Sequence, residues 1–277
     1  MKTQLVKVAV IDLYNNEENQ GIRCIKDIMN ELDCNYPNVS LDYKIFDTRF
    51  KGDLPGEEFD IYVSSGGPGS PFEGEGKRWE LDYFKLLDKL WAQNQNNSTK
   101  KHLFFICHSF QIMARYFKFG EVIPRHSKSF GVMPVHKTEF GETDNLFTGL
   151  SDPFFAADFR EWQVVQPNQK IFAELGAELL ALEKIRVDVP LERAMMAIRI
   201  SKEIAGTQFH PEADPASMYY HFRKPERKES VISKYGEKKY WEMLSLLEDE
   251  DGIKKTRKTV LPNFLKAAVE SIVKNNS

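Results

Sequence analysis

Strand-like apolar runs that alternate with helix-like segments constrain the fold of this chain more than any other feature. The strand-like runs cover 5–14, 39–47, 59–65 and 102–106. Between the first two, apolar residues recur at helical spacings from Ile22 to Leu32, and a further helical segment lies near 77–93. Strands that alternate with helices predict an α/β domain with a doubly wound, mostly parallel sheet.

The later part of the chain departs from this alternation. Residues 131–140, 178–185 and 193–201 are shorter strand-like runs joined by turns. We therefore expect part of the sheet to be mixed.

The composition changes beyond about residue 223, where a charged stretch precedes two amphipathic helical patterns. One pattern lies around 240–247 and the other around 261–273. Such stripes either pack against the chain's own core or form a docking face for a partner. We expect a core domain over 1–222 and a C-terminal helical extension over 223–277.

The composition also argues against several classes of protein. A net charge of −3 over 277 residues gives no general attraction for nucleic acid or anionic membranes. No apolar run approaches the roughly 18 residues that span a bilayer. Lys7 interrupts the N-terminal apolar run, which also lacks a signal-peptide cleavage site. Cys24, Cys34 and Cys107 form no CxxC pair, which favours a reducing compartment, by default the cytoplasm.

Cys107 lies between the strand-like run at 102–106 and a helix-like run at 111–117. At such a turn the side chain of a nucleophile is exposed, the next backbone N–H can point at an oxyanion, and the helix N-terminus favours a thiolate. A buried thiol that only fills the core fits the same pattern. Cys107 is therefore a candidate nucleophile that needs a base.

The candidate base is His210, which follows another apolar run in the stretch GTQFHPE. Glu212 lies on the same side of an extended chain, where its carboxylate can orient the imidazole. An adjacent imidazole favours the thiolate form of a cysteine. A surface histidine next to a turn is the simpler alternative. A metal site is remote, because no third ligand lies near these two residues in the sequence.

A third stretch, SSGGPGSPFE at 64–73, places glycines directly after a strand-like run. Glycines there let the backbone approach a ligand closely and aim N–H groups at an oxyanion. Two nucleotide-binding motifs are excluded by particular residues. A dinucleotide fingerprint would need glycine at Phe72, and a phosphate-binding loop ending at Lys77 would need glycine at Pro71. We therefore expect no cofactor.

Together and in this order, the three stretches resemble the class I glutamine amidotransferase family, the glutaminase unit found for example in GMP synthase. The resemblance spans about residues 5–222, and the QFHPE segment is its most specific piece. It implies a flavodoxin-like fold. It also implies Cys107 as the nucleophile, His210 as the general base and Glu212 as the residue that orients this base.

The resemblance further implies how substrate is held. The N–H groups of Gly67 and His108 would form the oxyanion hole, and Gly66 and Gln111 would contact the substrate. The family's chemistry is attack of a thiolate on the γ-amide of glutamine, release of ammonia, and hydrolysis of a γ-glutamyl thioester. Each step matches a role that the residues themselves indicate.

Four positions depart from the family's pattern, and one of them is Phe110, where the family usually has a histidine after the elbow glycine. The elbow usually has glycine two residues before and two residues after the cysteine, where Phe105 and Ser109 stand. Because strand and helix approach closely there, Phe105 predicts either a slightly opened backbone or a distorted elbow. Phe159 stands where the family often has a histidine, which would change how the substrate's α-amino and carboxylate groups are held.

Three functions remain open. The chain can be an amidotransferase that supplies ammonia to a synthase on another chain, since only about 55 residues follow the core and a further domain usually needs more. It can be a free-standing γ-glutamyl hydrolase that cleaves γ-glutamyl amines or peptides without a partner. It can also be a non-enzymatic interaction protein with a degenerate elbow, the alternative that Phe105 supports.

Overall fold

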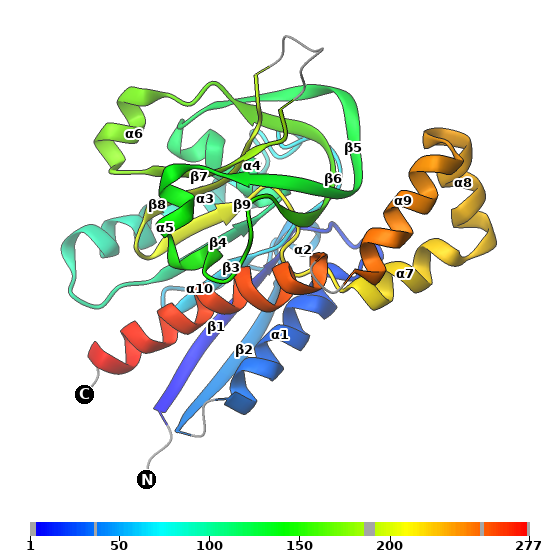
Figure 1. Ribbon diagram of the computed structural model, residues 1–277. Coiled ribbons are helices and arrows are strands. Elements are labelled where there is room, and N and C mark those ends of the chain that lie inside the picture. The colour runs from blue at the N-terminus through cyan, green and yellow to red at the C-terminus, as the bar shows by residue number, and fades with distance from the viewer. Residues whose placement is uncertain (1–3, 36–37, 186–191, 250–251, 276–277) are drawn as a thin grey trace.

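The computed structural model describes residues 4–35, 38–185, 192–249 and 252–275 (Figure 1). Its strands are β1 (Gln4–Asp12), β2 (Val39–Asp47), β3 (Ile61–Ser64), β4 (His102–Ile106), β5 (Glu121–Lys137), β6 (Phe154–Val165), β7 (Glu178–Glu183), β8 (Met195–Ser201) and β9 (Ile204–Thr207). Its helices are α1 (Gly21–Asn35), α2 (Thr48–Lys51), α3 (Arg78–Asn96), α4 (His108–Phe117), α5 (Glu139–Thr143), the 3-10 helix η1 (Asn145–Phe147), α6 (Gln169–Leu175), α7 (Pro215–Arg223), α8 (Pro225–Tyr235), α9 (Glu237–Glu248) and α10 (Ile253–Asn275).

Within these residues the strands form one sheet, in the order β2-β1-β3-β4-β9-β8-β7-β5-β6. The first five strands in this order are parallel, and the others continue the sheet with antiparallel pairings. The predicted α/β fold with a doubly wound core and a mixed region is therefore confirmed. Because β1 lies between β2 and β3, the sheet has a topological switch point there, and open α/β sheets bind ligands at such a point.

The long hairpin of β5 and β6 was not expected from the sequence. β5 begins at Glu121, well before the apolar run at 131–140, and its first half is polar and mostly exposed. β6 is buried over most of its length, so its sequence shows little alternation of polar and apolar residues. The hairpin positions the site, because β6 carries the residues that face the carboxyl ends of the parallel strands.

Helices cover both faces of the parallel part of the sheet. α1 and α10 pack on one face, and α3 and α4 pack on the other. The ring centroids of Phe264 in α10 and Phe104 in β4 are 4.9 Å apart. The apolar stripe at 261–273 therefore packs against the chain's own core. The division of the chain into 1–222 and 223–277 stays a prediction.

Helices α7, α8 and α9 stand beside the β5–β6 hairpin, and we call residues 215–248 the helical arm (Figure 1). Tyr240 and Met243 of α9 are buried against Val132 of β5, in a hydrophobic cluster separate from the two on the faces of the sheet. Gly131 lies beside this contact with a φ of 112°, which is in the region that favours glycine, whereas a Cβ there would stand at an ordinary contact distance of 3.4 Å from Met243 Cγ. The stripe around 240–247 thus also packs on the chain itself.

Candidate active site

Cys107 is the residue at which β4 turns into α4. Its backbone adopts φ 50° and ψ −96°, and its N–H donates to the Thr207 carbonyl at 2.8 Å. A positive φ at a non-glycine residue is strained, and this strand-to-helix turn is that of a nucleophile elbow. His108 is the first residue of α4, so its N–H has no acceptor within the helix and can be offered to an oxyanion.

Phe105 does not break the regular pairing of β4 that leads into the elbow. β4 keeps an unbroken register through Phe105, which pairs with Ser64 of β3 and Gly206 of β9. Its side chain is buried on the face of the sheet that α3 and α4 cover. A Cβ at Gly206 would stand 3.1 Å from the Phe105 Cβ and 3.0 Å from its carbonyl oxygen. The register of β4 therefore shows no opening of the backbone at Phe105, and Gly206 on the neighbouring strand leaves space for the Phe105 Cβ and carbonyl oxygen. A distorted elbow stays a prediction.

Ser109 ties the elbow to the next strand. Its Oγ accepts from the Ile106 N–H at 2.7 Å and donates to the Ser64 carbonyl at 2.8 Å. The residue is fully buried, so both bonds are protected from water. Serine in place of the family's glycine is therefore accommodated and adds two hydrogen bonds to the turn.

His210 and Glu212 follow β9 and face the elbow. His210 Nδ1 lies 2.8 Å from Glu212 Oε1, and Cys107 is close enough to the same ring to act on its charge. Burial lowers the pKa of His210, but the negative charges of Glu212 and the Cys107 thiolate, with the hydrogen bond to Glu212, outweigh it and raise this pKa well above its ordinary value. The three residues thus meet in an arrangement in which an imidazolium can balance a thiolate.

The glycine loop after β3 lies against the same histidine. A Cβ at Gly66 would stand 2.7 Å from His210 Cε1. A Cβ at Gly67 would stand 2.4 Å from the Leu13 carbonyl oxygen. Both positions therefore require glycine because other parts of the chain approach closely, and the approach of a ligand to this loop stays a prediction.

Arg49 of α2 braces this loop, and the sequence analysis missed it. Its Nη1 donates to the Pro68 carbonyl at 2.7 Å and lies 3.5 Å from His108 Nε2. Burial, with the positive charges of Arg49 and Arg115, lowers the pKa of His108 to about 3, so this ring stays neutral. A signal was present, since Arg49 follows a strand at the carboxyl edge of the sheet, as the other site residues do.

Gln111 lies one turn into α4 beyond the elbow. Its Nε2 donates to the Trp162 carbonyl at 3.2 Å and to Gln208 Oε1 at 3.3 Å. Gln208 in turn places its Nε2 3.9 Å from Cys107 Sγ. Gln208 was also missed, although it lies inside the stretch GTQFHPE that was singled out.

Two clefts meet at these residues. The first cleft has a volume of about 460 Å³ and is lined by Cys107 and Gln111. The second cleft has a volume of about 500 Å³ and is lined by His210 and Glu212. Residues that line both clefts are Gly67, Pro68, Phe159, His221, Phe222 and Arg227. The candidate nucleophile therefore faces one cleft and the candidate base the other.

Phe159 stands where the two clefts meet. Its ring centroid lies 6.4 Å from that of His210 and 5.2 Å from that of Phe130. It also stacks on Phe222 of the helical arm at 6.1 Å. Phe159, which the resemblance places where the family often has a histidine, thus lies within an aromatic cluster.

Other kinds of site can be checked in the described part of the chain. There, no three histidine, cysteine, aspartate or glutamate side chains are grouped so that they could hold a metal ion. Of the helices in the described ranges, none has the length and apolar character needed to cross a membrane. Cys24, Cys34 and Cys107 are free thiols.

Comparisons with known proteins agree with this geometry. The chain matches the model of the family "Glutamine amidotransferase class-I" over residues 10–224, and a comparison with curated proteins gave no significant match. Among solved structures, it is similar to a glutamine amidotransferase from Thermotoga maritima, with 20% identity, a TM-score of 0.67, and coverage of 96% of this chain and 98% of that one.

Two further solved structures are similar to this chain. One is a putative GMP synthase subunit from Thermoplasma acidophilum, with 15% identity, a TM-score of 0.59 and 98% of each chain covered. The other is the glutaminase domain of a Trypanosoma brucei CTPS with bound acivicin, with 12% identity, a TM-score of 0.56, and 96% and 94% covered. Because the family model matches most of its length, the chain belongs to the class-I glutamine amidotransferase family.

Proposed function

We propose that this chain hydrolyses the side-chain amide of glutamine with Cys107 as nucleophile, His210 as general acid and base, and Glu212 as the residue that orients His210. One observation carries the proposal. A cysteine held at φ 50° lies beside a histidine whose Nδ1 is 2.8 Å from a carboxylate. This is the relation of nucleophile, base and orienting group that covalent amide hydrolysis requires.

In the proposed reaction, the Cys107 thiolate attacks the γ-carbonyl carbon and the oxyanion accepts hydrogen bonds from the N–H groups of Gly67 and His108. The imidazolium of His210 gives its proton to the leaving nitrogen, so ammonia departs and a γ-glutamyl thioester remains. His210 then takes a proton from water, which attacks the thioester and releases glutamate. Gly66 and Gln111 hold the glutamyl part of the substrate.

The ammonia acceptor in this proposal is a synthase on a separate chain in the cytoplasm. Its support is that one similar structure is described as that of a putative GMP synthase subunit. The acceptor would receive ammonia directly, since ammonia released to water is protonated and loses its nucleophilicity.

A second candidate is a free-standing γ-glutamyl hydrolase that uses the same thioester. Two observations favour it. The second cleft, on the side of His210, is far larger than ammonia requires, and Phe159 alters the position at which the family pattern has a histidine. This candidate cleaves γ-glutamyl amines or peptides without a partner, whereas the amidotransferase prefers glutamine.

The test is ammonia and glutamate release from glutamine by the purified chain, with Cys107→Ala as the variant and Cys34→Ala as the matched control. Cys34 is exposed and lies on α1. Loss of glutamate release in Cys107→Ala alone supports the proposal. Equal activity in Cys107→Ala and the unchanged chain would show that another nucleophile acts. No activity in any of the three on glutamine or γ-glutamyl compounds would favour the interaction protein.

A further inference from the structure

We propose that the second cleft binds the leaving group of a γ-glutamyl peptide, and that Arg227 and Lys224 of the helical arm hold the carboxylate of this leaving group. The proposal rests on the thiol-amidase function proposed above. It adds a substrate class, γ-glutamyl α-amino acids, and a subsite for the amine half of the scissile bond.

The position of the base assigns the two clefts to the two halves of the substrate. Cys107 must touch the carbonyl carbon, and His210 must reach the nitrogen that leaves. Cys107 and Gln111 line the first cleft, whereas His210 lines the second. The scissile bond therefore spans the junction, with the glutamyl half in the first cleft and the leaving group in the second.

The size of the second cleft exceeds what glutamine needs. The leaving group of glutamine is ammonia, which is about as large as a water molecule, and water takes up about 30 Å³. The second cleft has a volume of about 500 Å³. It is therefore large enough to take an amino acid or a short peptide on the leaving nitrogen.

The helical arm forms one wall of this cleft and is held in place by aromatic contacts. Phe222 of α7 stacks on Phe159, and Tyr235 of α8 stacks on Phe130 with ring centroids 4.5 Å apart and planes 12° apart. These contacts fix the arm beside His210, whose ring lies 6.4 Å from that of Phe159. Cations on this wall thus have a defined place relative to the scissile nitrogen.

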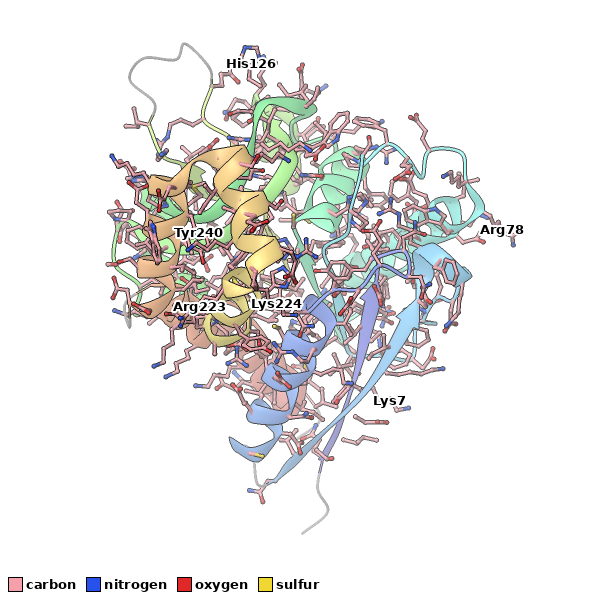
Figure 2. All side chains as sticks on the ribbon, turned by 90° about the vertical axis from the view of Figure 1, so that its right-hand side faces the viewer. Lys7, Arg78, His126, Arg223, Lys224 and Tyr240 are labelled. Atoms are coloured by element: carbon pink, nitrogen blue, oxygen red, sulfur yellow. The ribbon has the colours of Figure 1, made fainter. Side chains whose placement is uncertain are left out.

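Arg227 is the one charged side chain among the described residues that line both clefts, so it stands near the junction. Lys224 lines the second cleft. It lies one turn before Arg227, directly before the first residue of α8, and is labelled in Figure 2. In a γ-glutamyl α-amino acid the carboxylate is attached to the carbon next to the scissile nitrogen. A carboxylate in that position falls near the junction, where Arg227 can pair with it.

Two of the acids that line the second cleft already have partners. Glu212 is bonded to His210, and Asp214 Oδ2 pairs with Arg23 at 3.2 Å. Remaining acids that line this cleft are Glu17, Glu18 and Glu226, none of which lines the first cleft. Glu18 and Glu226 are close enough to act on His221, which lines both clefts, so they offset part of the positive charge of the two cations. Arg227 remains the one charged side chain among the described residues that line both clefts.

The experiment compares three substrates, glutamine, γ-glutamyl-alanine and γ-glutamyl-alaninamide, at low ionic strength. The test variant is Lys224→Gln with Arg227→Gln. The matched control is Arg223→Gln with Lys228→Gln. Like the test variant, it removes one arginine and one lysine from the helical arm, but these two residues line neither cleft. Figure 2 shows Arg223 and Lys224 side by side at the corner between α7 and α8.

We expect the unchanged chain to cleave γ-glutamyl-alanine with a higher kcat/KM than the alaninamide. The test variant should lower kcat/KM for γ-glutamyl-alanine about three- to tenfold and change that for the alaninamide less than twofold, since each exposed pair contributes modestly. Added salt should shrink the preference. The control variant should keep the preference. Equal losses on both peptides, or a preference that survives in the test variant, would overturn the assignment of Arg227 and Lys224.

Two outcomes separate this proposal from the proposed function. Cleavage of glutamine without cleavage of either γ-glutamyl compound would refute the peptide subsite and leave the glutaminase intact. Calorimetric binding to Cys107→Ala needs no turnover. Binding of γ-glutamyl-alanine no tighter than that of glutamine would also overturn the subsite, whether or not the chain is an active amidase.

Discussion

Replacing Phe105 by alanine removes a ring from the core beneath the elbow. Phe105 is 1% exposed and packs among the apolar residues of α3 and α4. Truncation of a buried phenylalanine to alanine costs about 3–5 kcal/mol of unfolding free energy, because transfer energy is lost and a cavity is left. For a chain of this size that corresponds to a fall in Tm of about 6–20 °C.

The same variant tests whether Phe105 limits the elbow. Because β4 pairs with β9 without a break at Phe105 and Gly206, Phe105→Ala should not raise glutamine hydrolysis. Stability is measured by urea unfolding followed through tryptophan fluorescence, and activity by ammonia release well below the Tm of the variant. Phe140→Ala is the control, since Phe140 is 55% exposed and its truncation should change stability by less than about 0.5 kcal/mol. A loss below about 1 kcal/mol in Phe105→Ala, or a gain in activity, would refute this reasoning.

Three other variants test the site. Glu212→Gln removes the charge that raises the pKa of His210, so NMR of the His210 ring should show its imidazolium titrating at lower pH. Glutamine hydrolysis should fall about a hundredfold or more. An unchanged titration of His210 would contradict this role of Glu212. Ser109→Ala leaves the buried Ile106 N–H without its acceptor and should cost about 1–3 kcal/mol in urea unfolding, whereas no loss would mean that the turn has another partner. Gly66→Ala should push the His210 ring from its position and lower kcat more than it raises KM in steady-state kinetics, and a rise in KM alone would argue against this contact.

The parts of the fold that were predicted are those in which local pattern and tertiary environment agree. β2 and β4 have the bounds that their apolar runs predict, because each run ends at polar or turn residues. β5 starts in a polar, exposed stretch and β6 is buried on both sides, so neither carries a period of two. α8 begins at Pro225 in a charged segment with few apolar residues, so its own pattern is weak, and its packing beside the hairpin stabilises it.

The candidate site also contains residues that the sequence could indicate and residues that only the fold brings together. Cys107, His210 and Glu212 could be singled out because each follows a strand within a short, specific motif, and the structure brings them together. The compensation of Phe105 by Gly206 could not be foreseen, since their pairing depends on β4 and β9 being neighbours in the sheet. Arg49 likewise reaches the glycine loop only through the fold.

The most direct test of the central claim is the intact mass of the chain after exposure to a γ-glutamyl chloroketone, with Cys107→Ser as the control. The reagent needs both a thiolate and a pocket for the glutamyl group, and it needs neither a partner nor turnover. We predict one adduct on the unchanged chain and none on Cys107→Ser. No adduct on the unchanged chain, or an adduct that persists in Cys107→Ser, would contradict the assignment of Cys107 as the nucleophile.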